Sequence, residues 1–320
     1  MLTPTGAREL RVNGLNWEAE GVLSVRLTDP SGEALPTWEP GAHLALHLPN
    51  GIVREFSLCS DPEDRTGWTV AVLREPSSRG GSAYVHVELR PGDLITVDGP
   101  RNNFQLEPAA RYVLVAGGIG ITPILAMARD LERRGADWSM LYAGRSAATM
   151  AFVDELEKLG TAHLRIHADD EAGGPPNLSE VLEGVDADTL VYCCGPEPLL
   201  KGVEEGLADA GCLRLERFKA PDPVAPPEGG DQPFEIVCAG SGRRVAVPVG
   251  TTALDALDQA GFDMPSSCTE GICGTCETKV LSGIVDHRDF LLSDSEKEAQ
   301  NTMFICVSRA LTPELTLDIS

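Results

Sequence analysis

The sequence predicts a protein of three parts: an antiparallel β-barrel, a parallel α/β sheet and a small α+β domain. Short β-branched segments separated by turn residues fill the first third. Apolar strands then alternate with helix-like stretches, and a proline- and glycine-rich segment precedes a cysteine-bearing last part. At 320 residues the chain is long enough for two or three cores. We expect the barrel at 1–107, the α/β part at 108–220, a linker at 221–232 and the last domain at 233–320.

The composition narrows the class of protein. A hydrophobic content of 42% and a charged content of 23% are typical of a soluble globular protein. The formal charge of −23 argues against nucleic acid as a partner. No apolar run approaches the ~20 residues that a membrane helix needs, and no secretory signal is predicted. The nine cysteines show no disulfide-like spacing, so we expect a reducing, cytoplasmic setting.

The barrel is predicted from evenly spaced strands. The segments Gly21–Leu27, His43–Leu48, Trp68–Leu73 and Asp93–Val97 are separated by turns such as Pro49-Asn50-Gly51. The isolated histidines have no metal-ligand spacing, and we interpret them as ordinary strand residues. They are His43, His47 and His86.

One predicted strand carries an arginine, an aromatic ring and a hydroxyl group at Arg54, Phe56 and Ser57. A flavin needs a flat apolar neighbour for its ring and a fixed cation for its phosphate. A surface strand would explain the same pattern, so the motif alone is weak.

A second barrel motif is Arg79-Gly80-Gly81-Ser82. Paired glycines expose backbone N–H groups that can form an anion-binding nest, with arginine and serine as side-chain donors. A plain loop is the alternative.

The α/β part opens with the continuous apolar run 111–116, which is typical of a strand covered on both faces. The run leads into Gly117-Gly118-Ile119-Gly120-Ile121-Thr122-Pro123 and then a helix-like stretch, 124–134. A loop between a strand and a helix favours a pyrophosphate, although this loop lacks the common Gly-x-Gly-x-x-Gly pattern. The alternative is a simple tight turn. The candidate residues are Gly117, Gly118, Gly120, Thr122 and Pro123.

A later strand of the same part ends in Cys193-Cys194-Gly195-Pro196. Open α/β sheets bind ligands at the carboxyl ends of their strands, so Cys194 could lie against a nicotinamide. We interpret the remaining cysteines outside the last domain's motif as small buried apolar residues. They are Cys59, Cys193, Cys212 and Cys238.

The last domain carries the most specific motif in the chain. Cys268, Cys273 and Cys276 have four and then two residues between them, and Cys306 follows in the apolar segment 303–307. This is the plant-type [2Fe–2S] spacing. Two irons need two thiolates each, so a loop must curl around one side while a separate strand closes the other. Gly271 and Gly274 would let amide N–H groups turn toward the sulfurs. Structural zinc or inert thiols are the alternatives.

Taken together, these motifs resemble the phthalate dioxygenase reductase family, which includes vanillate demethylase reductases. The resemblance covers essentially the whole chain. It implies FMN in the barrel, NADH in the middle part and the cluster in a C-terminal β-grasp, plant-type ferredoxin domain. It rests on Arg54-x-Phe56-Ser57, Arg79-Gly80-Gly81-Ser82, Gly117-Gly118-Ile119-Gly120-Ile121-Thr122-Pro123, Cys194-Gly195-Pro196, Glu216-x-Phe218 and the four cysteines.

The resemblance also implies residue roles. Arg54, Phe56 and Ser57 should hold the flavin, and Phe218 should cover its ring until nicotinamide displaces it. The flavin phosphate should lie at Arg79, Gly80, Gly81 and Ser82. Relatives that use FAD usually carry the ferredoxin domain first, so the order here favours FMN.

Two departures from the family pattern matter. Phe56 stands where the motif usually has tyrosine. The segment 142–146 has no acidic residue where the adenosine ribose should rest, and its Arg145 and Ser146 could accept a 2′-phosphate. We expect NADH, with NADPH left open.

The implied function is that of a reductase passing electrons from NADH through FMN and the cluster to a terminal oxygenase. A Rieske non-haem iron oxygenase is the expected acceptor, with a haem monooxygenase second, and we expect a monomer. The alternatives are a free-standing flavin or ferric reductase and a redox sensor without turnover.

Overall fold

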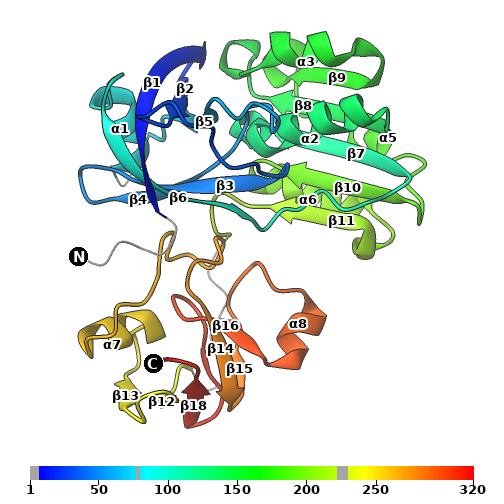
Figure 1. Ribbon diagram of the computed structural model, residues 1–320. Coiled ribbons are helices and arrows are strands. Elements are labelled where there is room, and N and C mark those ends of the chain that lie inside the picture. Colours follow the sequence, from blue (N-terminus) through cyan, green and yellow to red (C-terminus); the bar gives the residue numbers. More distant parts are fainter. Residues whose placement is uncertain (1–6, 77–79, 222–229) are drawn as a thin grey trace. The chain divides into compact units, whose positions relative to one another are not determined.

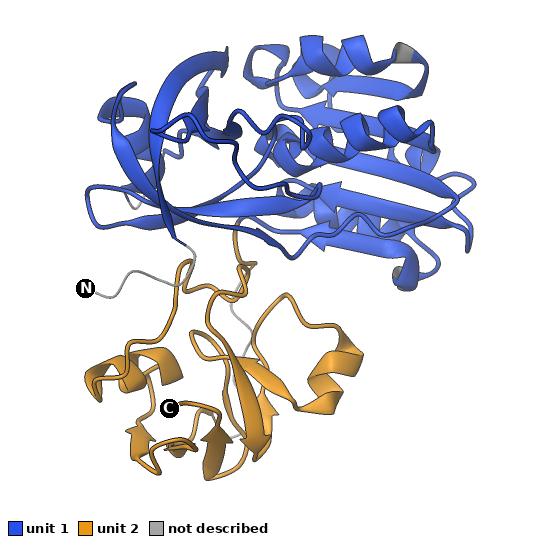
Figure 2. Cartoon of the chain, in the orientation of Figure 1, with its two compact units in different colours: residues 1–218 blue, residues 219–320 orange. Residues whose placement is uncertain are grey.

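The computed structural model describes residues 7–76, 80–221 and 230–320. The chain forms two compact units, residues 1–218 and residues 219–320 (Figure 2). Among the described residues, none of the helices combines the length and apolar character needed to span a bilayer.

The first sheet of unit 1 is wholly antiparallel, as the alternation of short strands and turns predicts (Figure 1). Its six strands run in the order β4-β3-β6-β1-β2-β5. A bridge between Leu58 and Val70 brings the two edges together, so the sheet curls toward a barrel. The strands are β1 (Arg8–Ala19), β2 (Val22–Thr28), β3 (Ala42–His47), β4 (Val53–Ser57), β5 (Trp68–Leu73) and β6 (Leu94–Asn102).

A short helix, α1 (Gly81–Val87), follows the sheet's fifth strand. His86 belongs to this helix, so its interpretation as a strand residue was wrong. Its Nε2 lies 2.8 Å from the backbone oxygen of Val72, which ties the helix to β5. The plain loop given as the alternative for the glycine pair is wrong, because Gly81 begins the helix and Gly80, at φ 100°, precedes it.

The second sheet of unit 1 is wholly parallel, in the order β11-β10-β7-β8-β9. Side chains of its central strand alternate between two cores. Leu114 packs with helices α2 and α3, and Val113 with α5 and α6, which is why the strand reads as a continuous apolar run. The elements are β7 (Arg111–Gly117), α2 (Ile121–Arg134), β8 (Asp137–Gly144), α3 (Val153–Leu159), β9 (Leu164–Ala168), α4 (Asp169–Ala172), α5 (Leu178–Val181), β10 (Thr189–Cys194), α6 (Glu197–Gly206) and β11 (Leu213–Glu216).

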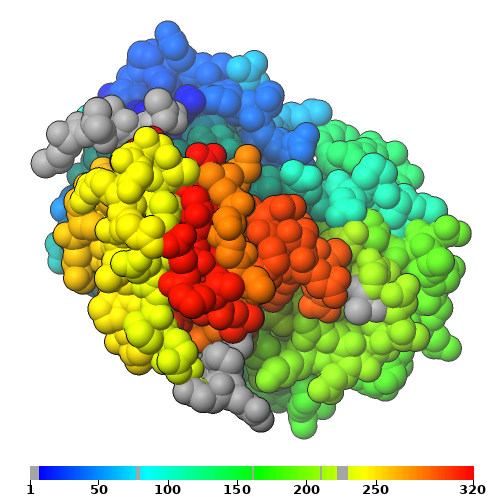
Figure 3. Space-filling model, turned by 90° about the horizontal axis from the view of Figure 1, so that it is seen from below, coloured from blue at the N-terminus to red at the C-terminus, as the bar shows by residue number. Residues whose placement is uncertain are grey.

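Unit 2 is built on a mixed sheet in the order β13-β12-β18-β14-β16. Strands β12 and β18 are parallel, while the other neighbours are antiparallel. Figure 3 shows the red β18 region between the yellow first hairpin and the orange segment that contains β14. The elements are β12 (Phe234–Cys238), β13 (Arg244–Val247), α7 (Ala253–Gln259), β14 (Glu277–Ser282), β15 (Val285–Asp286), α8 (Asp294–Ala299), β16 (Thr302–Phe304), β17 (Arg309–Ala310) and β18 (Glu314–Leu317).

Two features of unit 2 differ from the sequence-based expectations. Helix α8 was not predicted, although its start is a capping box in which Ser293 and Glu296 exchange hydrogen bonds. Cys306 was expected on a strand, yet it lies in the turn after β16. The chain reverses at this turn, and Cys306 therefore lies close to Cys276 of the cysteine-bearing loop.

Two arginines hold the residues just before β12 in unit 2. Arg288 Nη2 lies 2.5 Å from Asp231 Oδ1 and 2.6 Å from Asp286 Oδ2. Arg309, with 6% of its side chain exposed, donates to the backbone oxygens of Gln232, Pro248 and Thr251. These contacts join the residues before β12 to β15, to β17 and to the loop after β13.

Candidate functional site

Strand β4 presents its motif on two faces, because side chains alternate along a strand. Phe56 lies opposite Leu44 and packs, partly buried, against the barrel core. Ser57 points to the other face, where its hydroxyl donates to Glu216 Oε2 at 3.4 Å. The predicted aromatic and hydroxyl groups are therefore adjacent in sequence but serve different surfaces of the strand.

Arg54 meets the start of helix α1, which unites the two predicted flavin motifs. A Cβ placed on Gly81 would come within 2.6 Å of Arg54 Cγ, so only glycine leaves room for the arginine. Ser82 Oγ accepts a hydrogen bond from the backbone N–H of Glu75 at 3.1 Å. The Arg54 cation beside the helix start suits an anionic phosphate. Arg79, the second arginine predicted for this site, lies outside the described residues.

The predicted nucleotide loop and the later cysteine turn are in backbone contact. Gly117–Gly120 turns directly into α2. A Cβ on Gly120 would lie 2.2 Å from the backbone oxygen of Cys194, and one on Gly195 would lie 2.9 Å from Gly117 Cα. These glycines are thus required by close packing. The carboxyl ends of β7 and β10 form one edge, where an open α/β sheet binds its ligand.

Two further candidates stand at the start of α2. Thr122 is buried, and its hydroxyl donates to the backbone oxygen of Ile119 at 3.0 Å. Pro123 is buried in the first turn of the helix, where a missing N–H costs nothing. Both residues shape the loop.

Glu216 is the residue that reasoning from the sequence left without a role. Its carboxylate accepts from Ser57 and lies 4.0 Å from Cys194 Sγ. Burial raises the pKa of Glu216 to about 8, and burial beside Glu216 raises the pKa of the Cys194 thiol well above its usual range. Near neutral pH this group of three side chains therefore carries protons and no net charge. The signal was the neighbouring position of Cys194 and Glu216 on parallel strands, which needs the sheet order.

Phe218 follows two residues after Glu216 and is 39% exposed. Its side chain is therefore accessible near the end of β11, as a ring that covers a flavin would have to be.

Two acidic residues that lie distant in sequence, Asp169 and Asp170, follow β9 beside the segment predicted to hold the ribose. Arg145 follows β8, and its backbone oxygen accepts from the N–H of Asp170 at 3.1 Å, just after β9. Asp169 Oδ1 is buried and lies 3.4 Å from His167 Nε2. Ser146 Oγ lies 3.1 Å from Thr149 Oγ1. Two carboxylates thus stand at this edge of the sheet, which the segment 142–146 alone did not reveal.

The four thiols predicted to hold the cluster lie together in two pairs. A hydrogen bond from the Cys273 thiol lowers the pKa of Cys268 to about 7. Cys306 shares a hydrogen bond with Cys276, which together with burial raises its pKa far above the usual range. The pairs also interact electrostatically with each other. A two-by-two arrangement suits two irons with two thiolates each.

The backbone of the cysteine loop points N–H groups at these sulfurs. The N–H of Glu270 donates to Cys268 Sγ at 3.3 Å, and that of Gly271 donates to Cys306. Positive φ angles at Thr269, Gly271 and Gly274 produce this curl. Ser267 Oγ is buried beside Cys268 without a partner among the described residues. Such an unpaired donor would suit a cluster sulfide.

A single zinc ion fits this arrangement poorly. Structural zinc takes four ligands arranged around one point. Within the described residues, no three Cys, His, Asp or Glu side chains converge so as to hold one ion. The geometry favours the iron–sulfur interpretation of the cysteine spacing.

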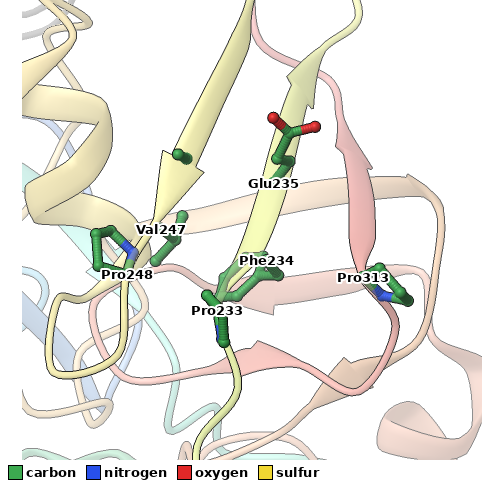
Figure 4. A pocket seen from close by; sticks show the side chains of 7 residues that line it. Pro233, Phe234, Glu235, Val247, Pro248 and Pro313 are labelled. Atoms are coloured by element: carbon green, nitrogen blue, oxygen red, sulfur yellow. The ribbon is translucent and has the colours of Figure 1, made fainter.

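A shallow pocket of about 450 Å³ opens on unit 2 at the start of β12 (Figure 4). Its lining is mostly apolar and holds none of the predicted site residues. The residues are Pro233, Phe234, Glu235, Ala246, Val247, Pro248 and Pro313.

Fold and site together define an oxidoreductase with a nucleotide-binding sheet and an iron–sulfur domain. Residues 114–205 match the family model described as an oxidoreductase NAD-binding domain. Residues 236–311 match the model described as a 2Fe-2S iron-sulfur cluster binding domain.

Comparison with similar proteins narrows this class of oxidoreductases to one family. Phthalate dioxygenase reductase of Burkholderia cepacia is 38% identical over 100% of both chains. A solved structure of phthalate dioxygenase reductase matches with a TM-score of 0.72 and 36% identity over 98% of both chains. The phenoxybenzoate dioxygenase subunit beta of Ectopseudomonas oleovorans is 42% identical over 97% of both chains. The chain therefore belongs to the phthalate dioxygenase reductase family.

A further solved structure is an intact type IV self-sufficient cytochrome P450 monooxygenase. It is 42% identical, with a TM-score of 0.90, over 98% of this chain. The match spans only 41% of the length of that P450.

Proposed function

We propose that the chain is the reductase component of a multicomponent oxygenase, passing electrons from NADH through FMN and a [2Fe–2S] cluster to a terminal oxygenase. The observation that carries this proposal is the pairing of four thiols in unit 2, alongside the meeting of Ser57, Cys194 and Glu216 in unit 1. FMN would accept a hydride and release single electrons, and the cluster would accept them one at a time.

The chain's own residues would bind and orient these groups. We assign the flavin phosphate to Arg54 and the start of α1, and the flavin ring to the surroundings of Phe56, Ser57 and Phe218. Glu216 keeps its own proton near neutral pH and accepts a hydrogen bond from the Ser57 hydroxyl, so this place would carry no net charge. Cys194, neutral and buried, would pack beside the nicotinamide without reacting with it. The proposed cluster ligands are Cys268, Cys273, Cys276 and Cys306.

The nicotinamide cofactor is proposed to be NADH. A carboxylate that faces the adenosine ribose favours the 2′-hydroxyl and repels a 2′-phosphate. Asp170 joins the backbone of Arg145 at this edge, which compensates for the absence of an acidic residue in 142–146. We also propose the division into a flavin part at 1–107, a nucleotide part at 108–220, a linker at 221–232 and a cluster part at 233–320.

The proposed acceptor is a Rieske non-haem iron oxygenase. The dioxygenase names of two relatives support it. A haem monooxygenase is the second candidate, supported by the similarity to part of a cytochrome P450. We propose weak, transient contact with either partner, which suits a monomer. We also propose that the protein works in the reducing cytoplasm, because all nine cysteines are free thiols in the structure.

Anaerobic addition of NADH to the purified protein tests the proposal. Absorption of a flavin and an iron–sulfur cluster should bleach within seconds, and the protein should then support turnover by a Rieske oxygenase better than by a haem monooxygenase. Cys273→Ser should keep NADH-dependent reduction of ferricyanide and lose delivery to the protein acceptor. Cys212→Ser, which changes a partly exposed thiol of unit 1, is the matched control. Undiminished delivery by Cys273→Ser would refute the proposed electron path.

A further inference from the structure

Helix α2 belongs to both halves of unit 1. Its first residues follow the nucleotide loop, and Ile121 and Leu125 pack in the core of the parallel sheet. Cys59 and Ala71 of the barrel half also pack in that core. Ala126 of α2 packs instead in the core of the barrel. One helix therefore contacts both the proposed pyrophosphate site and the barrel.

Arg129 connects this helix to the chain just after β4, the strand that carries the proposed flavin residues. Its guanidinium donates at once to the backbone oxygen of Cys59 and to the carboxylate of Glu155 in α3. Only 19% of the Arg129 side chain is exposed. Cys59 stands two residues after Ser57, and its N–H is bound to Thr69 O at 2.9 Å. The arginine thus fixes backbone that leads directly into the site.

Arg133, one turn further along, holds the loop that follows Cys59. Its guanidinium lies 3.2 Å from Asp61 Oδ1 and 3.5 Å from Glu63 Oε1. Its third contact is Asp130 Oδ1 at 2.5 Å, on a side chain that is 5% exposed. A buried carboxylate anchors the arginine, which spans from α2 to the barrel loop.

We propose that Arg129 and Arg133 are positioning residues for hydride transfer, holding the Ser57 end of β4 in register with the nucleotide loop at the start of α2. The inference rests on the proposed function. Hydride transfer depends steeply on alignment, and a small misplacement far from the reacting atoms slows it greatly. A rigid helix with one end at the nucleotide and the other clamped to the flavin strand supplies that alignment.

Variants of the full-length holoprotein test this proposal. Arg129→Met should slow flavin bleaching at saturating NADH by about tenfold, while flavin content and the NADH dissociation constant stay near wild type. Arg133→Met should do the same to a smaller extent. Asp61→Asn combined with Glu63→Gln should reproduce Arg133→Met, because it removes the same contacts from the other side.

Conservative variants separate geometry from charge. Arg129→Lys should remain slow, because an ammonium lacks the planar fork that reaches two acceptors at once. Arg133→Lys should recover most of the rate, since an ammonium can still pair with its two exposed partners on the barrel loop, Asp61 and Glu63. High salt should slow the wild type and leave Arg133→Met unchanged, because exposed pairs are screened.

Arg134→Met is the matched control. Arg134 shares the buried partner Asp130, at 2.5 Å, and among the described residues it has no ion pair with the barrel. Bleaching in Arg129→Met and Arg133→Met at the rate of Arg134→Met would overturn the inference. A wild type that NADH fails to bleach would instead refute the proposed function. If Arg129→Met loses its flavin, the bleaching rates of the Arg133 variants and of the Asp61→Asn, Glu63→Gln double variant test the inference instead.

Discussion

At the residue scale, the carboxyl group of Glu216 has the most unusual environment in unit 1. Burial favours its protonated form, so its pKa of about 8 in the folded chain exceeds the ordinary 4.5. Between these two values the folded state holds a proton that the unfolded state releases. The contribution of Glu216 to folding stability is therefore fully present below the lower value and is lost as the pH rises toward 8.

The fall of the Glu216 contribution with rising pH gives a testable prediction for flavin-free protein. The free energy of unfolding of unit 1 should drop on the order of a few kcal/mol between about pH 5 and about pH 8. Glu216→Gln should remove most of that dependence, because an amide does not titrate. Urea unfolding across the range measures it, with the exposed Glu183→Gln as control. Equal pH dependence in Glu216→Gln and wild type would assign the effect to other groups.

At the element scale, two loops recognised from the sequence meet mainly through their backbones. The turn Gly117–Gly120 and the turn Cys194–Pro196 approach so closely that no side chain fits between them. Such contact cannot relax easily, because both partners are main chain at the end of a buried strand.

Gly120→Ala should therefore be costly. Its Cβ would lie 2.2 Å from Cys194 O and 2.7 Å from Gly195 N, and overpacking of this kind costs about 1–3 kcal/mol. We expect a lower melting temperature and a higher KM for NADH. Gly14→Ala, where a Cβ meets nothing within 4 Å, should change neither. An unaltered KM in a folded Gly120→Ala protein would remove this loop from the nucleotide site.

The sequence was informative wherever chemistry is local. The cysteine spacing and the Gly117–Pro123 loop could both be recognised within a few residues of chain. Glu216, Asp170 and Arg129 could not, because their partners lie on other strands or in the other sheet. Helix α1 was missed because glycines at its start resemble a loop, and α8 because none of its residues is buried.

At the scale of the whole molecule, each unit has a hydrophobic core of its own. The core of unit 2 is formed by residues from Phe234 to Ile319, all within that unit. Both proposed thiol pairs and the N–H groups directed at them also lie inside it.

Residues 230–320 produced separately should therefore fold and assemble a cluster. The expected result is the absorption spectrum of a plant-type [2Fe–2S] centre after anaerobic reconstitution, with two irons per chain. Cys273→Ser in the same fragment should lose it. A fragment that stays unfolded, or that binds one metal ion per chain, would contradict this division.

The ion pair of Arg288 with Asp231 attaches the residues just before β12 to the rest of unit 2. Twelve residues lie between Phe218 and Asp231, a connection that spans at most about 45 Å when fully stretched. Because one chain carries both redox groups, their encounter does not depend on the concentration of the protein. Dilution of the protein would then leave the internal transfer untouched, a unimolecular event, while the final handover to a separate acceptor would slow in proportion.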